Sequence, residues 1–355
     1  MRISSIITAH AALSLQLLAS CTPTGPNSNQ SIVTKELTTS DGQTYVYDFT
    51  TAKNSSKPTL LLLHGYPASR HDWEQQITAL AASGFGVIAP DLLGFGDSSK
   101  PTDLEAYNLK TLSDHLAQIL DKEGLRDVVG VGHDWGANVL SRAVAWHPER
   151  FAKLVFVTVP YQPAGQFFDV DAANKGSLET VGYQRYAYWY FFNSWDAAEL
   201  MGRYLESFFH LAFHTNASAW GVDFTDLGSA RTWLNANTTT ELPSWLSTDY
   251  KTKWLHQYSQ PNALETSLNY YKALMRGIHA ADESVLTDED RTLRVPVLAV
   301  GAAKDLISDP EGQKIATEQW ASAGFEQRVV DAGHWIAVEK GEELSRILIE
   351  FAGSG

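Results

Sequence analysis

The most reactive pattern in the chain is Gly132-His-Asp-Trp-Gly136, which directly follows the apolar run 128–131. It matches a nucleophile elbow, a sharp turn from a strand into a helix that exposes one side chain, with Asp134 where serine more often stands. A carboxylate that attacked a carbonyl carbon would give an unstable anhydride, but it can displace a leaving group from saturated carbon. Asp134 therefore predicts an epoxide or an alkyl halide as substrate, and an alkyl ester of Asp134 as intermediate.

Two later residues are suited to hydrolysing such an ester. Asp305 follows the apolar run 295–300, and His334 follows the run 327–330, so both come after predicted strands. With Asp134 they stand in the order nucleophile, acid, histidine that this kind of elbow uses. We expect His334 to activate water, and Asp305 to fix the imidazole tautomer and stabilise its protonated form.

The segment His64-Gly-Tyr-Pro67, just after the apolar run 59–63, is predicted to complete the oxyanion hole. In this kind of site one backbone N–H comes from the residue after the nucleophile and one from a loop after an earlier strand. We expect these donors to be Trp135 and Tyr66. Glycine would let the backbone approach closely, and the Tyr-Pro bond is a candidate for the cis form. The supporting residues of this loop are His64, Gly65 and Pro67.

Apolar strand-like runs alternate with helical stretches in two blocks. The first block predicts strands at 43–50, 59–63, 86–90, 128–131 and 154–159, and the second predicts a strand at 295–300, a helix at 311–321, a strand at 327–330 and a helix at 342–351. Continuous apolar strands indicate a sheet covered on both faces. We therefore predict an α/β chain with a mostly parallel, doubly wound sheet.

The segment between the two blocks is rich in aromatic residues and loses the strand pattern. Its periodicity is helical around 197–213 and 264–275, which predicts a helical cap inserted between the two blocks, after the strand at 154–159. Most of these aromatics are expected to form core. The predicted organisation is a signal segment at 1–21, a linker at 22–30, core at 31–160, cap at 161–291 and core again at 292–355.

The N-terminus has the composition of an export signal. Arg2 precedes an apolar stretch at 6–18 that closes with Ala-Ser-Cys21, and the stretch is too short to span a membrane. Leu18-Ala-Ser-Cys21 also resembles a bacterial lipobox, in which the cysteine is lipidated. Cys21 is the only cysteine, so no internal disulfide can form. We expect an exported protein, either secreted or lipid-anchored at Cys21.

Charge and motif content exclude several other functions. The 355 residues carry a formal net charge of −14, which disfavours binding to nucleic acid or anionic lipid. Gly94-Phe-Gly96 lacks the further glycine of a dinucleotide fingerprint, and no phosphate loop or metal-ligand cluster is apparent in the sequence. We expect neither a cofactor nor a metal; the expected partners are a small substrate and water, and nucleic acid is not expected to bind.

Four segments together resemble a known family: His64-Gly-Tyr-Pro67, Gly132-His-Asp-Trp-Gly136, Ala303-Lys-Asp305 and Gly333-His-Trp335. They are similar to the soluble epoxide hydrolases of the α/β-hydrolase fold, over roughly residues 30–353. The resemblance implies an α/β-hydrolase fold with an inserted helical cap, and hydrolysis of an epoxide to a vicinal diol through an ester on Asp134.

The resemblance also implies two cap tyrosines that donate to the epoxide oxygen. Tyr188-Trp-Tyr-Phe-Phe192 resembles the first tyrosine segment and places this role on Tyr188, and Leu268-Asn-Tyr-Tyr-Lys272 resembles the second and places it on Tyr271. A slip of one or two positions, to Tyr186, Tyr190 or Tyr270, stays open. The substrate is expected to be a small apolar epoxide, and the residues expected around it are Trp135, Trp189 and Trp335.

Two alternative functions remain. Haloalkane dehalogenases share the His-Asp-Trp-Gly elbow, but the position of Tyr66 is often asparagine in them, and fluoroacetate dehalogenases carry arginines where this chain has Trp135 and Asn138. A catalytically inactive hydrolase fold that only binds a ligand is the other alternative. Such a protein would usually lack a member of the set formed by Asp134, Asp305 and His334.

Overall fold

The computed structural model of the chain describes residues 31–214, 216 and 219–354. The predicted signal segment at 1–21, the linker at 22–30 and the candidate lipidation site Cys21 lie outside the described residues. Within the described range, none of the helices combines the length and the apolar character that crossing a membrane would require.

Within these residues, eight strands form one sheet in the order β1-β2-β4-β3-β5-β6-β7-β8. The pairs β1–β2 and β2–β4 are antiparallel, and the pairs from β4–β3 to β7–β8 are parallel. Parallel neighbours require a crossover, usually through a helix, which explains why helices alternate with the later strands. The strands are β1 (Val33–Thr38), β2 (Thr44–Thr50), β3 (Thr59–Leu63), β4 (Gly86–Pro90), β5 (Val128–His133), β6 (Phe151–Val157), β7 (Val297–Ala302) and β8 (Phe325–Val330).

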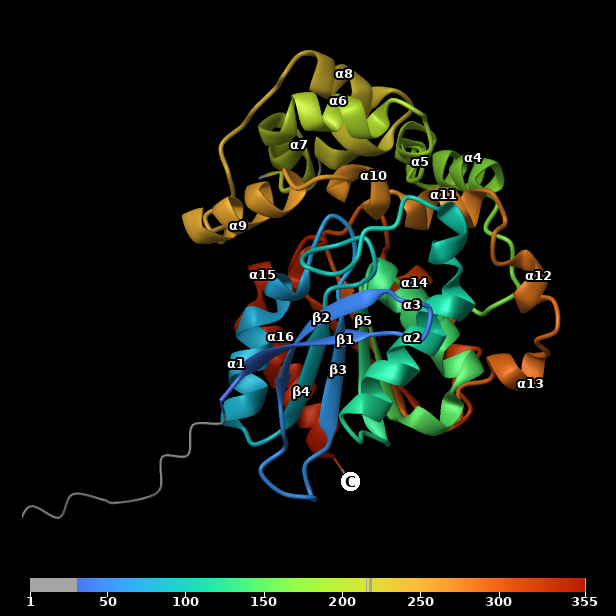
Figure 1. The fold of residues 1–355 in the computed structure, drawn as a ribbon. Coiled ribbons are helices and arrows are strands. Elements are labelled where there is room, and N and C mark those ends of the chain that lie inside the picture. Colours follow the sequence, from blue (N-terminus) through green and yellow to red (C-terminus); the bar gives the residue numbers. More distant parts are fainter. Residues whose placement is uncertain (1–30, 215, 217–218, 355) are drawn as a thin grey trace, which may run out of the picture.

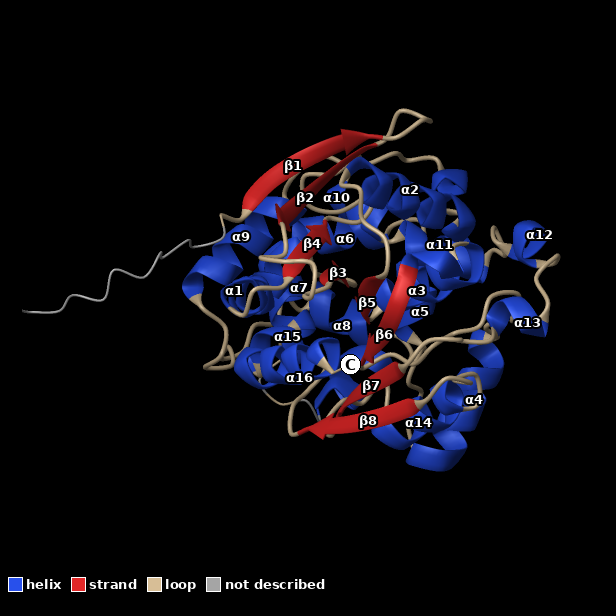
Figure 2. Cartoon of the chain, turned by 90° about the horizontal axis from the view of Figure 1, so that it is seen from below, coloured by secondary structure: helices blue, strands red, loops and turns tan. Residues whose placement is uncertain are grey.

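The central strands are buried on both faces. Every residue of β3 and β5 is buried, and successive residues point to opposite sides, so that Leu60 packs into one core cluster and Leu61 into another. Figure 2 shows α1, α15 and α16 on one side of the sheet and α2 and α3 on the other. The helices and helical turns of this core are η1 (Arg70–Trp73), α1 (Glu74–Ala82), η2 (Leu104–Tyr107), α2 (Leu109–Lys122), α3 (Trp135–Trp146), η3 (Pro148–Arg150), α14 (Pro310–Glu318), α15 (Ile336–Glu339) and α16 (Gly341–Gly353).

A helical segment is inserted between β6 and β7. Figure 1 shows most of its helices as a layer above the sheet, with α12 and α13 beside the core. They are α4 (Val170–Val181), α5 (Tyr188–Phe192), α6 (Ala197–Arg203), α7 (Leu205–Ala212), η5 (Gly221–Thr225), α8 (Ser229–Asn235), α9 (Thr248–Tyr258), α10 (Ala263–Ser267), α11 (Asn269–Met275), α12 (Ala280–Glu283) and α13 (Asp288–Arg291). The predicted class, an α/β chain with a mostly parallel doubly wound sheet and an inserted helical cap, is confirmed.

The structure differs from the sequence-based elements in three places. β1 was not predicted, because it is an edge strand whose residues are mostly exposed and carry little apolar alternation. The helix predicted at 197–213 is broken at Tyr204, whose φ of −125° and ψ of 45° leave the helical region. The helix predicted at 264–275 is divided at Leu268 into α10 and α11.

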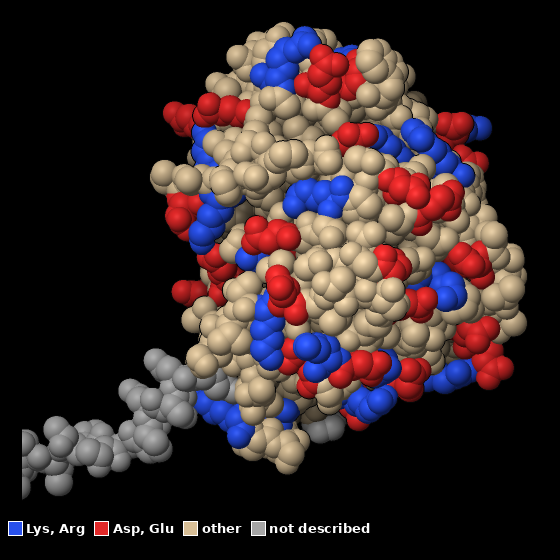
Figure 3. Space-filling view, in the orientation of Figure 1, with Lys and Arg blue, Asp and Glu red and all other residues tan. Residues whose placement is uncertain are grey.

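The surface carries both signs of charge. On the face shown in Figure 3, aspartate and glutamate side chains lie interspersed with lysine and arginine. Such mixing gives no single-sign patch on this face of the kind that would bind a polyanion.

Candidate active site

Asp134 stands at the turn between β5 and α3, in an uncommon backbone conformation. Its φ of 51° and ψ of −120° lie in a region that residues other than glycine rarely adopt. The helix α3 begins directly against β3, so a Cβ atom on Gly136 would lie 2.1 Å from the carbonyl oxygen of Leu63. The structure therefore forms the sharp turn that the sequence predicts.

The carboxylate of Asp134 is held by backbone donors. The N–H of Tyr66 donates to Oδ1 at 2.8 Å, and the backbone N–H of Trp135 also hydrogen-bonds this side chain. A Cβ atom on Gly65 would lie 2.3 Å from the same Oδ1, so only glycine leaves room there. Burial raises the pKa of Asp134, and the charge of His334 and the two N–H donors only partly offset it. Both predicted oxyanion-hole residues thus contact the predicted nucleophile.

His334 joins the other two predicted residues. Its Nδ1 lies 2.7 Å from Oδ2 of Asp305, and its Nε2 lies 3.7 Å from Oδ2 of Asp134. The second oxygen of Asp305 accepts the backbone N–H of Ile307 at 2.8 Å. Burial disfavours the imidazolium, but the charges of Asp305 and Asp134 outweigh it, so the pKa of His334 is raised. The structure brings all three predicted residues together at the ends of β5, β7 and β8.

Two more histidines support these residues. His64 faces the carbonyl of Gly65 through Nδ1 at 2.9 Å, while its Nε2 accepts the N–H of Leu92 at 3.0 Å. Burial lowers its pKa to about 4, so it is neutral and ties two loops together. The Tyr66–Pro67 bond in this segment is cis. His133, which the sequence analysis left without a role, contacts the carbonyl oxygen of His334 through Nε2 at 2.9 Å.

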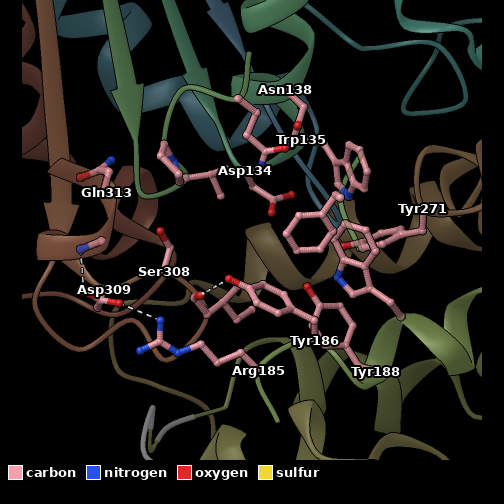
Figure 4. Close-up of a pocket in the computed structure, with 17 residues that line it drawn as sticks. Asp134, Trp135, Asn138, Arg185, Tyr186, Tyr188, Tyr271, Ser308, Asp309 and Gln313 are labelled. Atoms are coloured by element: carbon pink, nitrogen blue, oxygen red, sulfur yellow. Dashed lines mark hydrogen bonds and ion pairs between the residues drawn. The ribbon is translucent and has the colours of Figure 1, made fainter. Parts of the chain in front are cut away.

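A cavity of about 220 Å³ lies between the core and the cap, with Asp134 on its wall. Tyr188 of α5 and Tyr271 of α11 line it as well, and their ring centroids are 6.0 Å apart. Figure 4 shows these residues around the cavity, with Arg185 and Asp309 at another side. Of the predicted pocket tryptophans, Trp135 and Trp189 line this cavity.

Burial raises the pKa of both tyrosine hydroxyls well above 10, and the charge of Asp134 contributes to each rise. Both side chains therefore stay protonated at neutral pH and can donate a hydrogen bond. The alternative tyrosines use their hydroxyls elsewhere. Tyr190 donates to Asp171, Tyr270 donates to the carbonyl of Leu93 at 3.0 Å, and Tyr186, which lines the cavity, donates to the carbonyl of Ile307 at 3.2 Å. The geometry favours Tyr188 and Tyr271.

A second, smaller cavity of about 20 Å³ adjoins the first. Asp134, Tyr188, Tyr271 and Ile307 line both cavities. The smaller one also contacts His334 and the third predicted tryptophan, Trp335. Its remaining lining residues are Tyr66, Pro67, Phe208, Ala212, Trp220 and Phe224.

The larger cavity has a polar wall that the sequence analysis missed. Arg185 and Asp309 form an ion pair there, with Nη1 and Oδ2 2.7 Å apart. Asn138 is the member of this wall that a sequence signal could have found, because it lies one helical turn after Asp134 on α3. The others come from loops and from α14, so only the tertiary structure brings them together. The remaining polar residues of the wall are Gln162, Ser308 and Gln313.

Across the described residues, no group of three or more histidine, cysteine, aspartate or glutamate side chains is arranged to hold a metal ion.

Comparisons with known proteins agree with the fold. The family model for the alpha/beta hydrolase fold matches residues 58–341. Bifunctional epoxide hydrolase 2 of Mus musculus is 30% identical over 299 residues, covering 83% of this chain and 52% of its own length, so the chain spans about half of that relative. Epoxide hydrolase A of Mycobacterium tuberculosis is 28% identical over 303 residues, covering 83% of this chain and 90% of its own length.

Solved structures show the same architecture. Epoxide hydrolase A from Mycobacterium thermoresistibile superposes with a TM-score of 0.73 at 24% identity, over 90% of this chain and 98% of that one. An epoxide hydrolase from an endophytic Streptomyces gives a TM-score of 0.73 at 22% identity, over 90% and 95% of the two chains. The resemblance predicted from the four sequence segments is confirmed.

Proposed function

Because the chain belongs to the alpha/beta hydrolase fold family, we propose that it hydrolyses epoxides to vicinal diols. The observation that carries this proposal is the meeting of one carboxylate, Asp134, with two tyrosine hydroxyls, Tyr188 and Tyr271, around a single cavity. The names of the relatives from Mus musculus and Mycobacterium tuberculosis support the same activity. Opening an epoxide needs a nucleophile on one side of the ring and a proton donor for its oxygen on the other.

In the first step, Oδ2 of Asp134 attacks one ring carbon. Oδ1 is held by the N–H of Tyr66 and becomes the carbonyl oxygen of the ester. The bond between the attacked carbon and the ring oxygen breaks, and that oxygen takes a proton from Tyr188 or Tyr271. The products are an alkyl ester of Asp134, a hydroxyl on the substrate and a tyrosinate.

In the second step, Nε2 of His334 takes a proton from water, and the resulting hydroxide attacks the carboxyl carbon of Asp134. The backbone N–H groups of Tyr66 and Trp135 stabilise the negative charge that forms on Oδ1. The ester bond to Oδ2 breaks, the proton of the attacking hydroxide passes to the leaving alkoxide, and the diol departs with Oδ2. Asp305 stabilises the imidazolium, whose proton restores the tyrosinate through solvent.

A single turnover in oxygen-18 water tests this route. With enzyme in excess over a simple epoxide, the first diol should be unlabelled, because its new oxygen comes from Asp134, and the label should appear in the peptide that contains Asp134. The variant Asp134→Ala should be folded and should lose turnover by a factor on the order of 10⁴ or more. Labelled diol in the first turnover would mean that water attacks the epoxide directly.

Haloalkane dehalogenation is the second candidate, and one observation favours it. The indole Nε1 of Trp189 is buried, and Trp189 lines the cavity together with Trp135, which offers a second indole N–H. Two neutral N–H donors are what a departing halide needs. The two tyrosines favour the epoxide, since a halide leaving group takes no proton, whereas an epoxide oxygen must take one.

A further inference from the structure

We propose that the substrate is a terminal epoxide, with a bulky substituent on one ring carbon and hydrogen only on the other. This inference rests on the proposed function and specifies its substrate class. It follows from the unequal volumes of the two cavities that Asp134 lines, which measure about 220 Å³ and about 20 Å³.

The reacting groups stand at the junction of the two cavities. Asp134, Tyr188 and Tyr271 line both of them, so an epoxide held between the carboxylate and the hydroxyls borders both cavities. A further cavity of about 380 Å³ contacts Trp220, His334 and Trp335 but neither Asp134 nor the two tyrosines, so a substituent on a ring carbon must first enter one of the two cavities that Asp134 lines. The sizes of the cavities therefore limit which substitution patterns can react.

The larger cavity can hold a substantial group. An apolar cavity of about 150 Å³ accommodates a benzene molecule, and this one is larger, with Phe168 and Trp189 on its wall. A phenyl ring or an alkyl chain of similar volume fits there.

The smaller cavity has room for about one water molecule, which needs roughly 10–15 Å³. Its wall includes the buried aromatic rings of Phe208 and Phe224, and Phe224 stacks on Tyr188 with ring centroids 4.5 Å apart. A close-packed protein interior does not easily rearrange to make room for an added group. The same space borders both His334 and Asp134, which is where the water of the second step must lie. A second large substituent would exclude that water as well as clash with the aromatic wall.

Three epoxides and one substitution series test the inference. Styrene oxide carries one phenyl group, trans-stilbene oxide carries one on each ring carbon, and propylene oxide is small enough to fit regardless of the wall. For the unmodified protein, kcat/KM for styrene oxide should exceed that for trans-stilbene oxide by about 100-fold or more.

Phe208 is the side chain to shorten, because it lines the smaller cavity but not the larger one. Phe208→Ala should raise the ratio of kcat/KM for trans-stilbene oxide over styrene oxide by about tenfold or more. Phe208→Leu should raise it less, and it keeps the test valid if the alanine variant does not fold. Phe209, the next residue of α7, is equally buried and lines neither cavity, so Phe209→Ala and Phe209→Leu are the matched controls and should leave the ratio unchanged.

The outcomes separate this inference from the function on which it rests. Similar kcat/KM values for styrene oxide and trans-stilbene oxide would overturn the inference while supporting epoxide hydrolysis. An equal change of the ratio in the Phe208 and Phe209 variants, or no change in the folded Phe208 variants, would also overturn it. No turnover of any of the three epoxides would refute the proposed function, and the substrate class would be refuted with it.

Discussion

The sheet and the cap supply the candidate reactive groups in different ways. The carboxylates that follow strands are fixed by main-chain donors: Asp134 accepts the N–H of Tyr66, and Asp305 accepts the N–H of Ile307. The cap tyrosines are positioned by ring packing, Tyr188 against Phe224 and Tyr271 against Trp135, with centroids 4.5 Å and 4.8 Å apart.

In the proposed reaction, the cap and the sheet contribute to different steps. The cap provides the proton donors for ring opening, and the ends of β3, β5, β7 and β8 provide the nucleophile and the groups for ester hydrolysis. Changes in the cap should therefore slow the first step selectively. Changes at the strand ends should affect the second step, or both steps where they disturb Asp134.

The largest selective effect is expected from the cap tyrosines. Tyr188→Phe and Tyr271→Phe each remove one donor to the ring oxygen, which should slow formation of the ester by roughly 10²-fold, or about 3 kcal/mol. The double variant should nearly stop it. Rapid-mixing measurements of ester formation and decay would resolve the two steps, and decay should stay within a few-fold of the unmodified rate.

Tyr270→Phe is the matched control for these variants. Its hydroxyl donates to the carbonyl of Leu93, outside the cavity, so ester formation should be little affected in the folded variant. If Tyr188→Phe and Tyr271→Phe both form the ester at the unmodified rate, the cap tyrosines are not the proton donors.

On the sheet side, Gly65→Ala should slow both steps. The added Cβ would lie 2.3 Å from Oδ1 of Asp134 and must displace either the carboxylate or the loop that carries the N–H of Tyr66. A displacement of about 1 Å can slow a reaction by up to roughly 10²-fold. Gly42→Ala is a less crowded comparison, since nothing lies within 4 Å of its added Cβ, although its φ of 90° adds backbone strain. If the folded Gly65→Ala variant carried out both steps at the unmodified rates, that result would contradict the close approach of Gly65 to Asp134.

A smaller, several-fold effect is expected from pH, and it should differ between the two steps. The rate of ester formation should not fall as the pH is raised to 10, because burial raises the pKa of Tyr188 and of Tyr271 well above 10. Ester hydrolysis should slow as the pH falls, because protonated His334 cannot accept a proton from water. The pKa of His334 is raised above 6.5 in the free protein, partly by the charge of Asp134. Esterification of Asp134 removes that charge and should lower the pKa of His334. The rate of ester hydrolysis should therefore begin to fall at a lower pH than the pH at which His334 titrates in the free protein.

The sequence best predicted the positions of reactive residues that directly follow the ends of strands. Asp134 and Asp305 follow apolar runs and His334 follows a predicted strand, and parallel strands bring their carboxyl ends to one edge of a sheet, so the meeting of the three could be predicted. Gly65 and the N–H of Tyr66 could be predicted for the same reason, because their loop follows β3.

The cap was less predictable, because aromatic residues at helical spacing indicate burial without indicating which hydroxyl faces the reacting carboxylate. Tyr188 and Tyr190 both belong to α5, yet one lines the cavity and the other donates to Asp171. The polar wall with Arg185 and Asp309 joins residues 124 positions apart. The narrowness of the smaller cavity depends on side chains from separate cap helices, such as Phe208 and Phe224, which no local pattern relates to Asp134.

The intact mass of the variant His334→Gln after mixing with substrate tests the central claim most directly. Without the base that activates water, the ester on Asp134 should accumulate, and Asp134→Ala combined with His334→Gln should form none. We predict that styrene oxide adds its full mass to the protein, because ring opening releases no fragment, and that 1-bromobutane adds nothing at a comparable rate. The absence of an epoxide adduct, together with rapid gain of the bromoalkane mass less hydrogen bromide, would contradict epoxide hydrolysis and favour the dehalogenase.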